Sequence, residues 1–203
     1  MTKGDPPLAI IRDGAIRARL VDRITNKHAL GDTVKLFHEL GIYHGRHRVD
    51  LALINGAMHG YEIKSEADTV GRLAQQAEAF SQVFDKMTAV VAFKHLEHTL
   101  RIVPDWWGIQ VTDYDKSGQV AIRSLRSGYA NPNVNGRALV ELLWRDEALL
   151  QVQKMQLQVP KRGANRKYLY DTLVDQMPLT HLRRFVRETL KSRPAWRVAA
   201  PHE

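Results

Sequence analysis

Two short apolar runs on either side of Asn55-Gly56 form the clearest hydrophobic pattern in the chain. Residues 48–54 and 60–64 are each short and mostly apolar, and Asn-Gly is a strong turn signal, so this stretch predicts a β-hairpin. Asp50, Glu62 and Lys64 interrupt the apolar runs. Burying such charges costs several kcal/mol per ion unless they pair or hold a metal, so the hairpin is the first candidate for a functional site.

The length of the hairpin loop decides whether these charges meet. Glu62 and Lys64 share a strand face, because residues two apart on a strand point the same way. A three-residue loop, 55–57, would set position 50 opposite 62 and bring the carboxylates of Asp50 and Glu62 to one face. A two-residue turn at Asn55-Gly56 would send them to opposite faces. Gln76, on the apolar stripe of the following helix, favours the first alternative, an odd or bulged loop with converging carboxylates.

The rest of the first 127 residues alternates between helical and strand patterns. Asp13 can cap a helix that extends to about Arg23, and residues 33–41 fit a strand or a short helix equally well. Further helices are predicted at 70–84 and 94–102, and strands at 87–93, 109–112 and 119–124. This alternation indicates a mixed α/β sheet with helices packed on it.

Two features of these elements bear on the core. Gln76 lies on the apolar stripe of the helix at 70–84, so it needs a partner in the charged cluster or on the backbone. Trp106 and Trp107 could stack on unpaired bases, but such a pair beside a turn is interpreted as closing the core.

The C-terminal part differs in pattern and in charge. Residues 128–135 are rich in residues that favour turns, which predicts a linker. Helices are predicted after it at 136–153, 165–176 and 179–191. From 151 to 203 the chain has 11 Lys and Arg against 4 Asp and Glu. We therefore predict an α/β core at 1–127, a linker at 128–135 and a basic helical C-terminal region at 136–203.

Composition narrows the classes of protein. The formal net charge of +8 favours an anionic partner, most simply DNA, although a solvated helical surface would also explain the basic tail. The chain has no cysteine, which excludes disulfides, cysteine-ligated zinc and a thiol nucleophile. No long apolar run or signal peptide is present, so we expect a cytoplasmic protein that does not enter a membrane.

The charged hairpin suits a hard divalent cation. Mg²⁺ prefers oxygen ligands and usually one or two carboxylates, so Asp50 and Glu62 are candidate ligands with the backbone carbonyl of Ile63 as a third. Lys64 could orient an attacking water and stabilise negative charge on a phosphate. Mn²⁺ is an alternative metal.

Asp50, Glu62-x-Lys64 and the helix with Arg72-Leu73 and Gln76-x-x-x-Phe80 resemble the PD-(D/E)XK nuclease superfamily. The similarity covers residues 14 to 115 and is greatest to RecB-like domains and to small stand-alone prokaryotic and phage proteins, including MmcB-like ones. It implies a restriction-endonuclease-like fold, Mg²⁺ on the two acids, Lys64 assisting the water and Gln76 supporting the site. Glu39 is similar to a further acid of that pattern, as a catalytic residue and metal ligand. Val49 and Phe80 depart from its usual Pro and Tyr.

These observations predict a metal-dependent DNA nuclease, active in repair, phage biology or defence, that can form a homodimer. A DNA-binding protein that keeps the fold without cleaving is the alternative. A helical regulator whose α/β part senses a ligand is a third, disfavoured because no phosphate-cradling glycine loop is present. Basic residues expected to contact nucleic acid are Arg48, Arg72, Lys161, Arg162, Arg166, Lys167, Arg183, Arg184 and Arg187.

Overall fold

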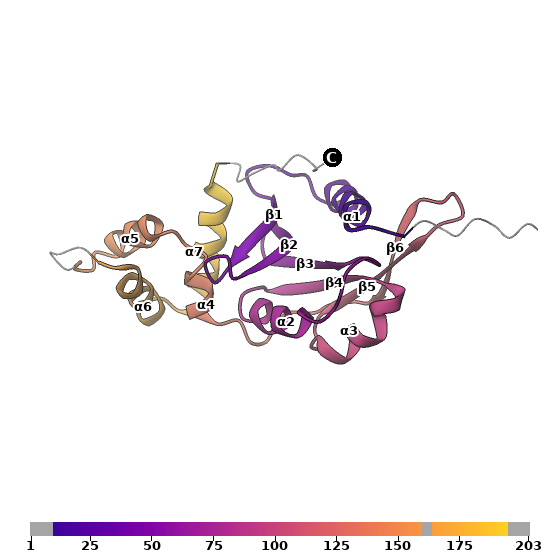
Figure 1. The fold of residues 1–203 in the computed structure, drawn as a ribbon. Helices are drawn as coiled ribbons and strands as arrows, with labels where there is room; N and C mark the ends of the chain where they lie inside the picture. Colours follow the sequence, from indigo (N-terminus) through magenta and orange to yellow (C-terminus); the bar gives the residue numbers. More distant parts are fainter. Residues whose placement is uncertain (1–9, 160–163, 195–203) are drawn as a thin grey trace, which may run out of the picture.

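The structure of the chain, a computed structural model, describes residues 10–159 and 164–194. Six strands of this part form one sheet in the order β1-β2-β3-β4-β5-β6 (Figure 1). The strands β3, β4 and β5 run parallel to one another, and the other neighbours are antiparallel. Their bounds are β1 Lys35–Ile42, β2 His47–Ile54, β3 Met58–Lys64, β4 Lys86–Ala92, β5 Gly108–Tyr114 and β6 Val120–Arg126.

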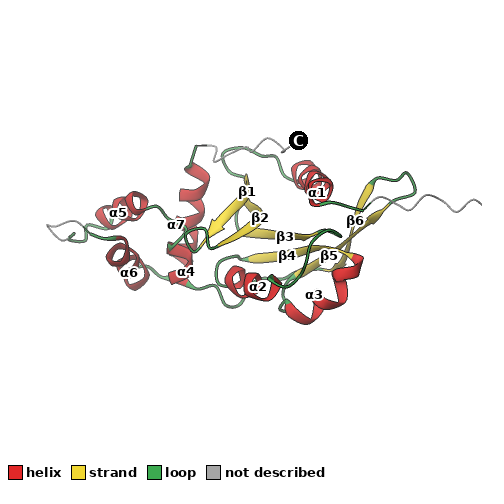
Figure 2. Ribbon diagram, viewed as in Figure 1, coloured by secondary structure: helices red, strands yellow, loops and turns green. Residues whose placement is uncertain are grey.

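Helices cover both faces of the sheet (Figure 2). Helix α1 lies on one face, α2 and α3 lie on the other, and α4 to α7 gather at the end of the molecule beside β1 and β2 (Figure 1). Their bounds are α1 Asp13–Lys27, α2 Leu73–Ser81, α3 Leu96–Ile102, α4 Gly136–Val140, α5 Arg145–Lys154, α6 Arg166–Gln176 and α7 Leu179–Ser192, with a 3₁₀ turn η1 at Phe93–His95.

The alternation of side chains along the strands produces two apolar layers. Leu51, Leu53, Tyr61 and Ile63 face α1, while the larger cluster joins the opposite face of the sheet to α2 and to the C-terminal helices. Trp106 and Trp107 are 5% and 0% exposed, so the prediction that this pair closes the core is confirmed.

The observed elements match the predicted types, and three of them add to or change the prediction. The ambiguous stretch 33–41 forms the strand β1, and the helix predicted at 70–84 is shorter, at Leu73–Ser81. The single helix predicted at 136–153 is two helices, because α5 starts anew where the Trp144 N–H donates to Glu147 Oε2 at 2.7 Å. A local cap therefore interrupts an apolar pattern that continues through the break.

Residues 128–135 are held against the α/β core. The Asn131 side chain is 5% exposed and donates to the carbonyls of Ser81 and Phe84 at 2.7 and 2.8 Å. The Asn135 N–H donates to the Gln82 carbonyl at 2.8 Å. The division into core, linker and C-terminal region stays a prediction, and the segment predicted as a linker is hydrogen-bonded to the core.

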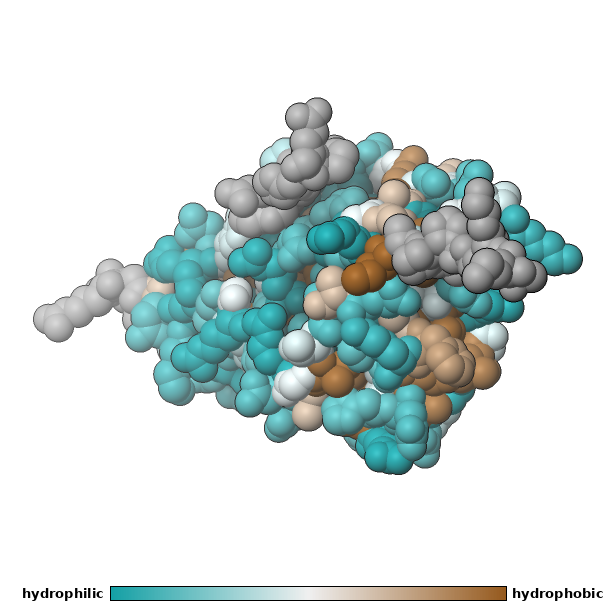
Figure 3. Space-filling model, turned by 45° about the vertical axis from the view of Figure 1, so that its right-hand side comes forward, coloured by the Kyte–Doolittle hydropathy of each residue, from teal (hydrophilic) through white to brown (hydrophobic). Residues whose placement is uncertain are grey.

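The mixed α/β class predicted from the sequence is confirmed by the six-stranded sheet and its helices. Hydrophilic residues cover most of the face drawn in Figure 3, with hydrophobic residues in smaller groups between them. None of the helices in residues 10–159 and 164–194 combines the length and the hydropathy that a membrane span requires.

Candidate functional site

Three carboxylates form a row across the strands β1, β2 and β3. Glu39 lies between residues that pair with Leu51 and Val49, which sets it opposite Asp50. The pairing of Leu51 with Tyr61 likewise sets Asp50 beside Glu62. Acids directly opposite one another repel, so this row needs cations close by.

The hairpin loop has three residues. Ile54 pairs with Met58, which leaves 55–57 as the loop, and the Ala57 N–H donates to Asn55 Oδ1 at 2.9 Å. The structure has the alternative that Gln76 favoured, in which Asp50 and Glu62 share a face. The simple two-residue turn at Asn55-Gly56 is wrong.

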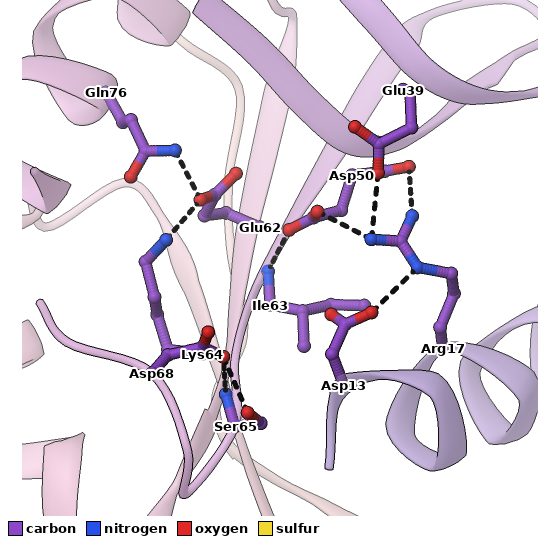
Figure 4. A network of polar contacts seen from close by, with 10 residues as sticks. All are labelled: Asp13, Arg17, Glu39, Asp50, Glu62, Ile63, Lys64, Ser65, Asp68 and Gln76. Atoms are coloured by element: carbon purple, nitrogen blue, oxygen red, sulfur yellow. Dashed lines mark hydrogen bonds and ion pairs between the residues drawn. The ribbon is translucent and has the colours of Figure 1, made fainter. Parts of the chain in front are cut away.

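Arg17 of helix α1 supplies the first cation. Its Nη2 lies 2.7 Å from Asp50 Oδ1 and 2.9 Å from Glu39 Oε1, and its Nε donates to Asp13 at 3.1 Å (Figure 4). Sequence reasoning missed this residue, although Arg17 follows the buried Ile16 directly in the predicted helix. One guanidinium therefore holds three carboxylates from three elements.

Glu39 adopts a backbone conformation that is rare within a strand. Its φ of 54° lies in the left-handed region, which costs about 1–2 kcal/mol for a residue with a Cβ. Such strain clusters at functional sites, since the surrounding structure must enforce it. Here it accompanies the contact between the Glu39 carboxylate and Arg17.

Glu62 is buried next to the second cation. Its Oε1 accepts hydrogen bonds from Lys64 Nζ and from Gln76 Nε2, both at 2.6 Å, while its Oε2 has no partner. Gln76 thus meets the charged cluster, one of the two options that the sequence left open. Burial raises the pKa of Glu62 to about 8, with a further rise from Asp50 and an opposing effect of Lys64. This carboxyl is therefore largely protonated at neutral pH.

Asp50 is the central member of the row. Its Oδ2 accepts the Ile63 N–H at 2.7 Å, and its Oδ1 accepts from Arg17. Burial raises the pKa of Asp50, and these two contacts oppose the rise. The contact that involves Ile63 is made by its N–H, and the use of its carbonyl as a metal ligand stays a prediction.

The cluster lies at the base of a cleft of about 560 Å³. Arg46, Arg48 and Arg72 line this cleft and are exposed. None of the three makes an ion pair with any residue in the described ranges. Arg48 and Arg72 were predicted from the sequence, whereas Arg46, two residues before Arg48, was missed.

The remaining basic residues predicted to contact nucleic acid are distributed differently. Lys167 pairs with Asp171 at 2.7 Å, and Arg183 and Arg187 pair with Asp85. Arg166 and Arg184 are exposed, and Arg166 lines a second cavity that shares Glu39 and Arg48 with the cleft. Lys161 and Arg162 lie outside the described residues.

The carboxylate row does not offer Mg²⁺ a ready set of ligands. Both oxygens of Asp50 are engaged, and Arg17 stands between Asp50 and Glu39 where a cation would lie. Across residues 10–159 and 164–194, no three carboxylate or histidine side chains are placed together to hold a metal ion. The predicted Mg²⁺ or Mn²⁺ site stays a prediction, and a metal ion there would have to displace the proton that Glu62 holds at neutral pH.

Most of the chain matches one known protein family. The family described as Bacteriophage P4 protein cII matches residues 9–197. Protein cII of Enterobacteria phage P4 is similar, with 24% identity over 184 residues that cover 91% of this chain and 68% of the phage protein. No solved structure matches the chain.

The family match overturns the nuclease prediction. The resemblance to the PD-(D/E)XK superfamily, and with it the predicted metal-dependent phosphodiesterase and its place in DNA repair, is wrong, because the matching family is that of phage P4 protein cII. The acids, the lysine and Gln76 lie together as expected, but Asp50, Glu62 and Lys64 form a short pattern that any hairpin with a three-residue loop can bring to one face. Site geometry alone does not establish an activity.

Proposed function

Because this chain belongs to the bacteriophage P4 protein cII family, we propose that it is a non-enzymatic regulatory protein that binds the backbone of DNA. The cleft beside the carboxylate row is the proposed contact surface. Positioning on DNA depends on cationic side chains that reach phosphate oxygens, and arginine does so with paired hydrogen bonds.

One observation carries the proposal. Arg46, Arg48 and Arg72 are exposed at the cleft, and none of them makes an ion pair with a described residue. Arginines that line a cleft without carboxylate partners leave their hydrogen-bond donors free for an external anion.

The acids at the base of the cleft do not cancel this positive rim. Asp50 and Glu39 are bound to Arg17, and Glu62 is hydrogen-bonded to Lys64 and is largely protonated at neutral pH. Opposite charges a few Å apart screen one another from a ligand at the rim. The cations of the cleft without an acidic partner are therefore its three exposed arginines, while Glu39, although its side chain is 44% exposed, is paired with Arg17.

Two finer predictions belong with this proposal. The order of α1, the strands β1 to β3, α2 and β4 supports a restriction-endonuclease-like topology for the core. A shared topology does not carry a shared activity, so this is compatible with a binding protein. The second is the cytoplasmic location, which we keep as part of the proposal because a DNA-binding protein must share a compartment with DNA.

A binding titration tests the function. We would measure the affinity of the full chain for a fluorescently labelled DNA duplex by anisotropy at several salt concentrations. The triple variant Arg46→Ala, Arg48→Ala, Arg72→Ala is expected to bind at least tenfold more weakly. Its salt dependence should flatten by about one unit of slope for each lost phosphate contact.

The matched control removes the same charge elsewhere. Arg19, Arg101 and Arg123 are exposed and do not line the cleft, so the triple alanine variant at these positions should lose much less affinity. If both triple variants lost the same DNA affinity, the loss would follow from net charge alone. That result would contradict a specific contact surface at the cleft. Absence of binding by the parent protein at low salt would reject DNA as the partner.

A further inference from the structure

A third cavity lies beneath helix α1, on the face of the sheet opposite to Glu62. We call it the α1 pocket, and its volume is about 390 Å³. Leu20 and Ile24 of α1 line it from above, and His59 and Tyr61 of β3 line it from the sheet. Since side chains alternate along a strand, His59 and Tyr61 point away from the face that carries Glu62. The α1 pocket is thus separate from the cleft.

The basic groups of the α1 pocket have no acidic counterparts. Arg23, Lys27, His28 and Lys86 line it, and no aspartate or glutamate does. Within the described ranges none of these four makes an ion pair, although one nitrogen of Arg23 donates to the Ile122 carbonyl at 2.6 Å. The C-terminal end of α1 adds a partial negative charge, which Lys27 in the last turn offsets.

The inner wall of the α1 pocket is polar and neutral. The rings of His59 and Tyr61 stack with centroids 4.2 Å apart, and His59 Nε2 lies 2.8 Å from Thr88 Oγ1. Burial lowers the pKa of His59 to about 4, with smaller effects from Lys86 and His28, so this ring is neutral at pH 7. The cationic groups therefore belong to the rim alone.

One polar atom at the α1 pocket lacks a partner. Gln110 lines the cavity, and its Oε1 is buried without a hydrogen-bond donor. A buried acceptor without a donor destabilises a protein, and each such atom in a native structure calls for an explanation. An N–H group of a bound ligand would satisfy it once the Gln110 side chain turns this oxygen towards the cavity.

We propose that the α1 pocket binds a nucleotide, with its phosphate against Lys27, Lys86 and Arg23 and an N–H of its base against Gln110 Oε1. The volume lies within the usual range for small-ligand sites, about 300–1,000 Å³. A phosphate alone would use the cationic rim and leave the Gln110 acceptor unsatisfied. This inference goes beyond DNA binding at the cleft and does not depend on it.

Calorimetry with the full chain tests this inference. The probes are AMP, GMP, CMP, UMP and inorganic phosphate, each titrated at low ionic strength. At least one mononucleotide is expected to bind, and to bind at least tenfold more tightly than inorganic phosphate. No binding of any mononucleotide at millimolar concentration, or phosphate binding equally well, would overturn the proposal.

Variants separate the two parts of the ligand. The double variant Lys27→Ala, Lys86→Ala should bind the nucleotide about tenfold or more weakly, since charge-assisted hydrogen bonds are lost. The double variant Lys35→Ala, Lys94→Ala removes the same charge outside the pocket and should bind like the parent. Equal affinities of the two double variants would overturn the assignment of the phosphate.

Gln110→Met tests the base contact without depending on the lysines. It removes the orphaned acceptor at similar volume, so the free protein should be at least as stable while nucleotide binding weakens. A variant that binds the nucleotide as tightly as the parent would overturn the Gln110 contact. The triple variant at Arg46, Arg48 and Arg72 should keep nucleotide binding, which distinguishes failure of the α1 pocket from failure of DNA binding at the cleft.

Discussion

Glu62 shows how a single buried carboxyl can make stability depend on pH. It is 2% exposed, and its pKa lies near 8 against an ordinary value of 4.5. The folded protein therefore binds this proton more tightly than the unfolded chain does. The stability contributed by the proton is full below pH 4.5 and is lost as the pH rises towards 8.

This linkage predicts the behaviour of Glu62→Gln. In the parent protein the free energy of unfolding should fall between pH 5 and 8 by on the order of a few kcal/mol, as Glu62 is forced to ionise. The amide of the variant cannot ionise, so most of this fall should be absent. Urea titrations at several pH values measure it, with the exposed Glu78→Gln on α2 as the control. An unchanged pH slope in Glu62→Gln would show that the carboxyl is not protonated in the folded state.

Arg17 places a positive charge beside Glu39 and Asp50, as Lys64 does beside Glu62. Without it, Asp13, Glu39 and Asp50 would face one another across a short distance with no cation. Arg17→Ala should therefore lower the free energy of unfolding by about 1–3 kcal/mol and make the melting temperature rise with added Mg²⁺. Thermal melts with and without Mg²⁺ measure this, with the exposed Arg19→Ala as control. A variant that melts at the same temperature at every Mg²⁺ concentration would refute the idea that Arg17 stands in a cation position.

At the scale of elements, the register of the β2–β3 hairpin decides which side chains lie next to one another. A loop of three residues brings Asp50 and Glu62 to one face, and a loop of two would have separated them. The Asn55-Gly56 signal alone predicts the hairpin correctly and its loop incorrectly. Contacts beyond the loop decide the register, including the Met58 N–H, which donates to Asp85 Oδ2 at 2.7 Å.

The junction after β6 depends on the close approach of two glycines. A Cβ on Gly128 would lie 2.7 Å from the backbone nitrogen of Gly108, and backbone atoms cannot yield as a flexible side chain does. Gly128→Ala should therefore destabilise the protein by about 1–3 kcal/mol in thermal or urea unfolding. Gly14→Ala, where a Cβ meets nothing within 4 Å at the start of α1, should be neutral or stabilising. Similar stability of the two variants would contradict the tight packing of this junction.

At the scale of the whole molecule, Asp85 joins the sheet to the C-terminal helices. It is 6% exposed and pairs with Arg183 and Arg187 of α7, while its Oδ2 also holds the hairpin at Met58. The larger apolar cluster likewise extends from the sheet into α4 to α7. The described part of the chain is thus tied together by both polar and apolar contacts.

This continuity predicts one cooperative unfolding transition. Asp85→Ala should be less stable by about 2–3 kcal/mol, because two partly buried arginines and the Met58 N–H lose their partner. Differential scanning calorimetry and urea unfolding measure both effects. Asp146→Ala removes an exposed pair with Arg145 and should change stability by less than about 0.5 kcal/mol. Two separate transitions in the parent protein would show that α4 to α7 unfold on their own.

Hydrophobic periodicity by itself determined the kinds and order of most elements. Strands and helices have periods set by the local backbone, so 87–93 and 179–191 could be assigned without any tertiary contact, and they correspond to β4 and α7. The same local information identified Asp50, Glu62, Lys64 and Gln76, because charged or amide groups in an apolar pattern stand out.

Only the tertiary structure decided which of these groups meet and what surrounds them. The row from Glu39 to Glu62 depends on strand register, and Arg17 joins it from a helix 33 residues away from Asp50. The α1 pocket gathers Lys27, Lys86 and Gln110 from three elements that share no local pattern. Such contacts are set by the packing of distant segments, and no period in the sequence reports that packing.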